Sequence, residues 1–271
     1  RSVMSKINNP INKDNFLFEL GCEELPPKAL PNLARSLHSY VTEALGSFGL
    51  KFEESEWFAT PRRLAIRITQ LDVAQENKLV EKLGPAVSAA FDNDGNAKPA
   101  AVGFAKSNGV DVASLSKKET SKGERLAFIA EVIGKPTTIL LQDILPKAIS
   151  QLPVPKAMRW GDHQHQFSRP VHWVLAIIGN QTIDLEIMGE VSSNTTFGHR
   201  FHSPDAIVIN TPSEYESKLS SAKVVACFEE RKAKIRIQVE NIAKKINATA
   251  VISEELLEEV TSLVEWPVAL L

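Results

Sequence analysis

Cysteine is scarce in this sequence of 271 residues, which contains only Cys22 and Cys227. The two lie far apart, and neither belongs to a Cys-x-x-Cys pair or a Cys/His spacing typical of zinc ligands. The sequence therefore excludes a disulfide-rich scaffold and a cysteine-based zinc site. We expect both to be buried free thiols, as in proteins of a reducing cytoplasm.

Long hydrophobic runs are also missing. No apolar stretch approaches the roughly 20 residues that a membrane-spanning helix needs, and the start of the chain lacks the pattern of a secretory signal peptide. Apolar residues make up 43% and charged residues 24% of the chain, as in soluble globular proteins. We expect a cytoplasmic protein.

Neither sign of charge dominates the sequence. It has 31 Lys and Arg against 33 Asp and Glu, a formal net charge of −2. A general basic field for nucleic acid is thus excluded, and any such contact has to come from a local patch.

Motifs that indicate catalysis are absent as well. The sequence has no GxxxxGK[ST] or GxGxxG loop for phosphates, no GxSxG nucleophile turn and no HExxH zinc motif. No catalytic residue and no cofactor-binding residue can be named from the chain itself, so we expect neither a cofactor nor a metal in it.

Apolar periodicity predicts alternating helices and strands without a repeated βαβ rhythm. Together they predict an α+β fold in which helices pack on mixed, partly antiparallel sheets. The expected strands are residues 16–20, 57–59, 64–68, 126–132, 171–178, 182–188 and 207–209. The expected helices run from Pro27 or Pro31 to Phe48, over 100–106, 137–149 and about 228–247, and onward from Ser253.

The last of these helices has a marked apolar pattern. Ser253 is a favourable N-cap, and the expected core face consists of Leu256, Leu257, Val260, Leu263 and Val264.

Two closely spaced prolines suggest a division of the chain. Pro153 and Pro155 stop the helix before them and favour extended chain, so we expect two subdomains, residues 16–152 and 153–271. Residues 1–15 are expected to be a loose tail that starts with a tag remnant. Because the chain ends within an apolar run, we expect the second subdomain to be truncated.

The least common side chains gather between Lys156 and His202. Five of the six histidines and two of the four tryptophans fall in this window. Arginine and tryptophan offer planar donors and stacking faces that suit phosphates and unstacked bases. The same groups could instead form a polar joint between two sheets.

A metal site in this window is an alternative. His163 and His165 would share one face of a strand, and Asp162 with His199 or His202 could complete a ligand set. No recognised ligand spacing supports this alternative, so we expect no metal.

Seven segments in fixed order carry a family resemblance, and they span residues 19 to 268. The chain resembles the amino-terminal part of the beta subunit of bacterial two-subunit glycyl-tRNA synthetases. The segments are Glu19–Leu30 (ELGCEELPPKAL), Thr60–Ala65 (TPRRLA), Lys82–Ala86 (KLGPA), Pro155–Gly161 (PKAMRWG), Arg169–Trp173 (RPVHW), Gly198–Phe201 (GHRF) and Leu256–Val268, with LLEEV and LVEWPV.

The resemblance implies a necessary but non-catalytic part of a glycine-tRNA ligase. It implies tRNA(Gly) binding and assembly into an alpha2beta2 heterotetramer, with ATP and Mg on the separate alpha subunit and no activity of this chain alone. Two alternatives remain open: a pure assembly module without RNA contact, and an editing or metal-dependent hydrolase that uses the histidine-rich window.

Candidate contact residues follow from the resemblance and from side-chain chemistry. Arg62 and Arg63 lie at a turn between two expected strands, where side chains project into water. They could contact phosphate or be merely solvated. The full set expected to bind tRNA or the partner subunit is Arg62, Arg63, Lys156, Arg159, Trp160, Arg169, His199, Arg200 and His202.

Overall fold

The computed structural model describes residues 12–155, 158–159, 166–167 and 169–271. It divides into two compact units. The main unit combines the chain up to Gln75 with Lys135–Leu271, and the insert unit is Glu76–Gly134. Both mix helices with antiparallel strands, which confirms the predicted α+β class.

The expected boundary after residue 152 coincides with neither junction between these units. The strand that follows it, β9 (Val171–Ile178), pairs with β1 (Lys13–Cys22) along most of its length. The chain before and after Pro153 therefore belongs to one sheet. Prolines interrupt a helix locally, but they carry no information about which distant strands pair.

The main unit is built on a seven-stranded sheet with β1 at its centre. β1 pairs antiparallel with β9 on one side and with β3 on the other. The spatial order is β11 (Glu186–Ile187), β12 (Glu190–Ser193), β9, β1, β3 (Arg63–Asp72) and β2 (Glu54–Thr60), with β10 (Gln181–Thr182) paired to β9.

The single strand expected over residues 182–188 is wrong. The segment splits into β10, which pairs with β9, and β11, which pairs with β12. β12 then runs parallel to β9. Beside this sheet lie two small antiparallel pairs, β7 (Met158–Arg159) with β8 (Gln166–Phe167), and β13 (Thr195–Phe197) with β14 (Ala206–Val208).

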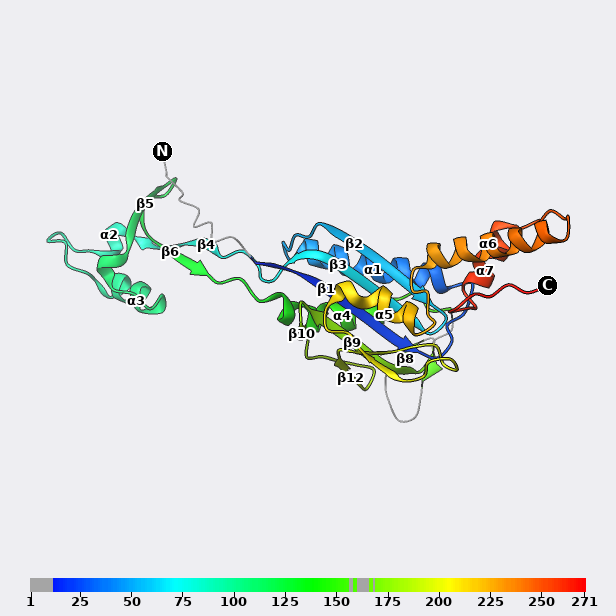
Figure 1. Ribbon diagram of the computed structural model, residues 1–271. Helices are drawn as coiled ribbons and strands as arrows, with labels where there is room; N and C mark the ends of the chain where they lie inside the picture. Colours follow the sequence, from blue (N-terminus) through cyan, green and yellow to red (C-terminus); the bar gives the residue numbers. More distant parts are fainter. Residues whose placement is uncertain (1–11, 156–157, 160–165, 168) are drawn as a thin grey trace. The chain divides into compact units, whose positions relative to one another are not determined.

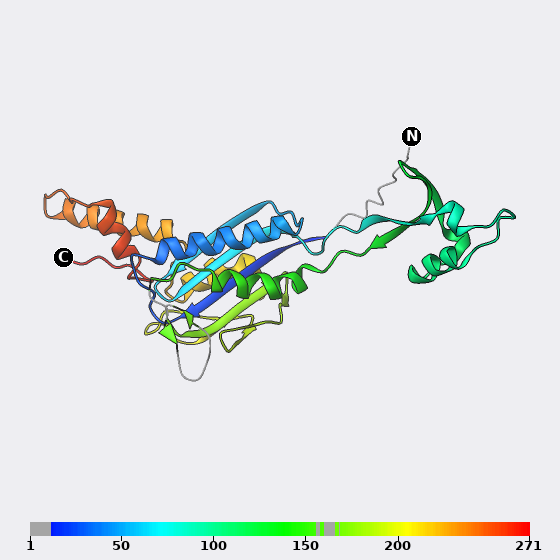
Figure 2. The same cartoon turned by 180° about the vertical axis from the view of Figure 1, so that it is seen from behind.

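Two helices cover one face of the sheet. Phe16, Phe18 and Leu20 of β1 point to this face, because alternate residues of a strand share a side. They pack against α1 (Leu30–Ser47) and α4 (Thr137–Ser150), which lie side by side in Figure 2. Leu33, Leu37, Val41 and Leu45 of α1 recur at helical spacing and are all buried, whereas Phe48 at the end of the expected helix is 40% exposed.

A thinner layer covers the other face, as Figure 1 shows. It contains a 3-10 turn, η2 (Pro212–Glu214), and α5 (Tyr215–Ser221). Tyr215 and Leu219 pack on Leu17, Phe58 and Leu175 from three strands. Both faces of β1 are thus buried, and residues 16 to 20 are fully inaccessible.

Two helices form the carboxyl-terminal part, α6 (Phe228–Lys245) and α7 (Glu254–Thr261). The hydroxyl of Ser253 accepts a hydrogen bond from the backbone N–H of Leu256, which confirms the predicted N-cap. The predicted core face of α7 is only partly right, because Leu257 is buried but Leu256 and Leu263 are exposed. In the part of the chain that the structure describes, no helix is both long and apolar enough to span a membrane.

The insert unit has a small core of its own. Its three-stranded antiparallel sheet has the order β4 (Lys78–Ala86), β6 (Gly123–Val132), β5 (Ser116–Thr120). Three short helical segments accompany it: α2 (Val87–Ala90), α3 (Pro99–Ser107) and η1 (Val112–Ser114). Ala90, Ala101 and Leu126 form the buried centre. The sequence predicted α3 and β6, but not β4 and β5, whose residues are largely exposed and charged.

The two cysteines differ in environment. Both are free, Cys22 is fully buried at the end of β1, and Cys227 is only partly buried. Burial raises the pKa of the Cys22 thiol well above its usual value. In the native protein at pH 8 we expect a thiol reagent to modify Cys227 at least about tenfold faster than Cys22, since the thiolate is the reactive form. Peptide mapping would measure both rates, and equal native rates would contradict this expectation.

Candidate functional site

A buried carboxylate lies at the centre of the main sheet. Glu19 of β1 faces the α5 layer and is inaccessible to solvent. Its Oε1 accepts hydrogen bonds of 2.5 Å from the indole Nε1 of Trp173 and from the hydroxyl of Thr196. Its Oε2 accepts a hydrogen bond from the hydroxyl of Tyr215 and lies 3.5 Å from a terminal nitrogen of Arg63. A buried charge requires such partners to be tolerated.

Arg63 connects this carboxylate to the carboxyl-terminal segment. Its Nε donates to the hydroxyl of Thr60 at 3.0 Å, and a terminal nitrogen lies 3.2 Å from Oε1 of Glu265. Burial opposes the charge on Arg63, but the carboxylates of Glu265 and Glu19 outweigh it and raise the guanidinium pKa. We call these seven residues the buried polar cluster: Glu19, Thr60, Arg63, Trp173, Thr196, Tyr215 and Glu265.

The expectation that Arg63 projects into water is therefore wrong. The turn between β2 and β3 consists only of Pro61 and Arg62, because Thr60 already pairs with Arg63. As the first residue of β3, Arg63 shares a face with Ala65, which packs beneath the α5 layer. Each nitrogen of its guanidinium has an acceptor and the side chain is buried, so it is not available to a phosphate in this structure.

A glycine makes room for the indole of this cluster. Gly21 of β1 pairs with Trp173 of β9, and the indole lies directly over the glycine. A Cβ at position 21 would come within 1.9 Å of Cε2 of Trp173. The missing side chain thus allows the Trp173 ring to lie flat across β1 and reach Glu19.

A second buried arginine holds the last helices to the sheet. Arg231 of α6 donates hydrogen bonds to the carbonyls of Thr261, Val225 and Ala59, at 3.0, 2.6 and 2.7 Å. Burial lowers its pKa to about 10. Because Arg231 and the buried polar cluster are almost completely inaccessible, we interpret them as structural connections rather than as a substrate site.

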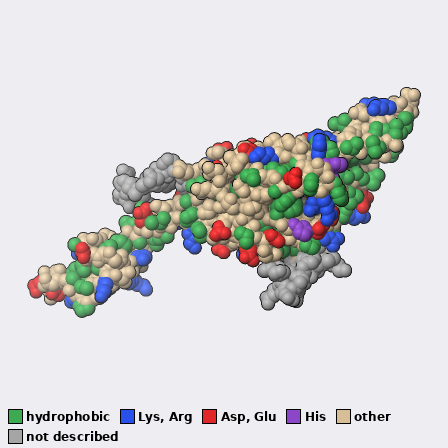
Figure 3. Space-filling model, turned by 60° about the horizontal axis from the view of Figure 1, so that its bottom comes forward, with side chains coloured by type: hydrophobic (Ala, Val, Ile, Leu, Met, Phe, Trp, Pro, Cys, Tyr) green, Lys and Arg blue, Asp and Glu red, His purple; other side chains and the backbone are tan. Residues whose placement is uncertain are grey.

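An exposed group of charges lies at the adjoining end of the sheet. Arg200 donates to Oε1 of Glu24 at 2.9 Å and lies 3.6 Å from Oε2 of Glu23. Nε2 of His172 lies 2.9 Å from Oε1 of Glu23, and Nε of Arg169 donates to the carbonyl of Glu24 at 2.9 Å. We call these five residues the exposed charge cluster. In Figure 3 a histidine side chain lies among acidic and basic ones on the face shown.

The carboxylate of Glu23 in the exposed charge cluster is held ionised. Slight burial would raise the pKa of Glu23, but the hydrogen bond with His172 and the Arg200 guanidinium together hold it below its usual range. Arg200 therefore already has two anionic partners. A phosphate that binds Arg200 has to compete with them, so Arg200 is a weaker phosphate donor than its exposure suggests.

Arg62 differs from the other arginines of this region. It is partly buried, with its guanidinium carbon 5.6 Å from the centre of the Trp173 ring. Its Nε is buried, and among the described residues none accepts a hydrogen bond from it. No carboxylate of the described residues pairs with this guanidinium, which lies over the indole, so its charge is open to an external anion at the exposed part of the side chain.

The histidines beside Arg200 are packed together. The rings of His199 and His202 are 4.5 Å apart, and Nδ1 of His199 accepts from the backbone N–H groups of Phe201 and His202. Burial lowers the pKa of His199, and the nearby charges of His202 and Arg62 act in the same direction. His199 is therefore a neutral ring at neutral pH.

The predicted contact residues are thus only partly brought together. Arg169 and Arg200 meet at Glu24, with His199 and His202 next in the chain and Arg62 close to His199. Lys156 and Trp160 lie outside the described residues, and for Arg159 only the backbone in β7 is described. The convergence of these three with the others stays a prediction.

Sequence reasoning did not identify the carboxylates Glu19, Glu23, Glu24 and Glu265 as partners of the arginines. One signal was available: a single glutamate inside the apolar run of β1 requires a buried partner. Its partner is 44 residues away along the chain, however, and spacing alone does not reveal it.

No metal centre is evident in the described part of the chain, where no three His, Cys, Asp or Glu side chains are grouped to bind an ion. His163, His165 and Asp162, the other members of the hypothetical ligand set, lie outside the described residues. The expected absence of metal therefore stays a prediction.

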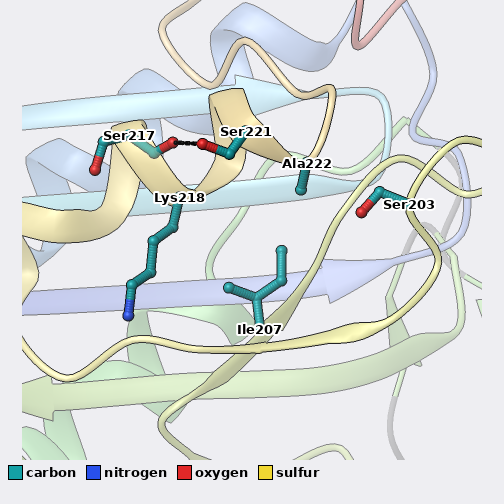
Figure 4. A pocket seen from close by; sticks show the side chains of 6 residues that line it. All are labelled: Ser203, Ile207, Ser217, Lys218, Ser221 and Ala222. Atoms are coloured by element: carbon teal, nitrogen blue, oxygen red, sulfur yellow. Dashed lines mark hydrogen bonds between the residues drawn. The ribbon is translucent and has the colours of Figure 1, made fainter.

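A shallow pocket lies between α5 and the loop after β13. Six residues line it: Ser203, Ile207, Ser217, Lys218, Ser221 and Ala222 (Figure 4). Its one cation, Lys218, is engaged by Glu214 at 2.8 Å and by the carbonyl of Val208 at 2.7 Å. The hydroxyl of Ser221 donates to the backbone carbonyl of Ser217. The pocket thus offers no free charged group to a ligand.

Comparison with known proteins gives a consistent result. The family model described as "Glycyl-tRNA synthetase beta subunit" matches residues 16–271. Curated proteins named glycine–tRNA ligase beta subunit are 49% identical over 262 residues in Hahella chejuensis and 47% identical over 260 residues in Pseudoalteromonas translucida. Each alignment covers 96% of this chain but 38% of the relative. The chain therefore belongs to the family of glycyl-tRNA synthetase beta subunits.

Proposed function

We propose that this chain is the part of a glycine-tRNA ligase that binds tRNA(Gly) and joins a separate catalytic alpha subunit. The family match over residues 16–271 is the observation that carries this proposal. The relatives are named as one subunit of a ligase, which implies a partner. ATP, Mg and glycine activation belong to that alpha subunit in a cytoplasmic alpha2beta2 assembly, and this chain alone is inactive.

The side-chain geometry favours Arg62 as a contact to the tRNA backbone. Its guanidinium is held over Trp173, and no carboxylate of the described residues forms an ion pair with it. Its Nε is buried, so a phosphate oxygen would accept a charge-assisted hydrogen bond from a terminal nitrogen instead. Arg169, Arg200, His199 and His202 then border the contact, with Arg200 partly neutralised by Glu23 and Glu24.

An assembly module without RNA contact is the second candidate. The two carboxylates that pair with Arg200 favour it, because they would repel a polyanion and suit a protein partner instead. The hydrolase alternative depends on His163 and His165, which lie outside the described residues. Salt-dependent tRNA binding separates the first two candidates.

Arg62→Ala is expected to weaken tRNA(Gly) binding and to reduce the salt dependence of log Kd by about one unit, because one phosphate contact is lost. Thermal stability should change by less than about 1 kcal/mol, since no hydrogen bond of the fold is removed. Filter binding at several salt concentrations and glycylation with the alpha subunit would measure the effect.

Arg35→Ala is the matched control. Arg35 also lies 5.6 Å from a tryptophan ring, that of Trp57, but it is exposed on α1. Equal losses from both substitutions would indicate a general charge effect. An unchanged salt slope for Arg62→Ala would favour the assembly module.

A further inference from the structure

An apolar stripe in α7 and the turn after it is only partly covered by the described structure. In α7, Leu257 is 2% exposed, Leu256 is 56% exposed and Val260 is partly buried; Leu263, just after the helix, is 57% exposed. Leu256, Val260 and Leu263 are spaced at i, i+4 and i+7, so they lie along one side of the helix and its final turn. This spacing is typical of a helix face that packs against another element.

Further exposed apolar side chains lie in the same stretch of the chain. Eight of the exposed large apolar side chains of the main unit lie between Ile237 and Leu271, against five in the rest of its described residues. They include Ile246 at 54%, Val251 at 96% and Val268 at 66% exposure. Figure 3 shows hydrophobic side chains over the end of the molecule that contains α6. A concentration of this kind marks an interaction surface rather than ordinary surface variation.

The charges beside the stripe restrict the chemistry of its partner. Glu254 is paired with Lys232 and Arg236 across to α6. For Glu255 and Glu259, which border the stripe, no ion pair is found among the described residues. A partner with apolar anchors flanked by Lys or Arg would satisfy both features.

The lengths of the relatives suggest that such a partner belongs to the same subunit. This chain spans only 37–38% of the beta subunits that it matches. The family model extends to residue 271, ten residues beyond the end of α7. We propose that the stripe Leu256, Val260 and Leu263 is an internal docking surface, covered in the full-length subunit by an amphipathic, basic-flanked segment that follows the position of Leu271. This inference concerns the architecture of the subunit and goes beyond the proposed function.

Cysteine labelling tests the proposal in two proteins. One is the 271-residue chain, and the other is the same chain continued by the remaining part of the Hahella chejuensis subunit. Leu256→Cys is introduced in a Cys227→Ser background, because Cys22 is buried. We expect maleimide labelling at position 256 to be at least about tenfold slower in the longer protein, as for a residue that becomes buried. Val191→Cys, on β12 and 65% exposed, is the matched control and should change by less than about twofold.

Three results would overturn the proposal. The rate at position 256 could be equal in both proteins, it could depend on protein concentration in the 271-residue chain, or it could fall only after the alpha subunit is added. The second would assign the stripe to another copy of the chain and the third to the partner subunit.

A second variant shows whether the stripe is already covered. Leu256→Asp should leave the melting temperature of the 271-residue chain unchanged and make the longer protein more sensitive to protease after residue 271. A clear loss of stability in the 271-residue chain would contradict an open stripe. Neither experiment depends on tRNA, so failure of the docking proposal is distinguishable from failure of the proposed function.

Discussion

Arg63→Met is expected to lower the free energy of unfolding by about 3–5 kcal/mol, because it leaves two buried carboxylates without their cation. Arg63 is fully buried, and its terminal nitrogens lie 3.5 Å from Glu19 and 3.2 Å from Glu265. Methionine keeps much of the volume but supplies no donor. Urea denaturation followed by tryptophan fluorescence would measure the change.

The neighbouring arginine is the matched control for this substitution. Arg62→Met should cost less than about 1 kcal/mol, since Arg62 makes no ion pair with the described residues. If Arg63→Met had an equally small effect, the buried polar cluster would contribute little to stability. The two variants also separate function from fold, because only Arg62 is expected to contact tRNA.

Gly21→Ala is expected to lower the free energy of unfolding by about 3 kcal/mol, because overpacking forces the indole of Trp173 away from the sheet. The new Cβ would lie 1.9 Å from Cε2 of that indole. Movement of the ring would also break its hydrogen bond to Glu19 and leave a buried carboxylate less satisfied. The same denaturation experiment, with near-ultraviolet circular dichroism of the indole, would report both effects.

Gly46→Ala is the control for a glycine without such a neighbour. A Cβ at position 46 meets nothing within 4 Å, and the residue lies in α1. The substitution should raise stability by up to about 1 kcal/mol through helix propensity. In a Trp173→Ala background the clashing indole is absent. Gly21→Ala should then lower the free energy of unfolding much less, as expected for two residues in direct contact. Additive effects of the two substitutions would refute the clash.

The site could be located from the sequence only in part. The resemblance and the density of Arg, His and Trp singled out the segments that contribute Arg62, Arg169, His199 and Arg200. From the sequence, Arg62 and Arg63 were both expected to project into water, although Arg62 is partly exposed and Arg63 is fully buried. Strand alternation places adjacent side chains on opposite sides, but which side is covered depends on α5, some 150 residues later.

Local elements could be predicted from the sequence. The helix α1, the strand β1 and the Ser253 cap depend on residues a few positions apart, where apolar spacing and capping chemistry act directly. The segments 182–188 and 256–264 were harder: the first pairs with two different strands, and in the second Leu257 is buried while Leu256 and Leu263 are exposed. In both cases the missing information lies in other elements.

The sequence by itself determined the α+β class, most α-helices, most of the longer strands, the beta-subunit resemblance and the absence of nameable catalytic motifs, because these depend on local pattern and composition. Only the tertiary structure decided that Arg63 is buried between Glu19 and Glu265, residues separated from it by 44 and 202 positions. It likewise decided that Gly21 makes room for Trp173 and that α7 has an uncovered apolar side. A side chain's burial and charge pairing are set by what folds over it, and that contact is made in space between residues distant along the chain.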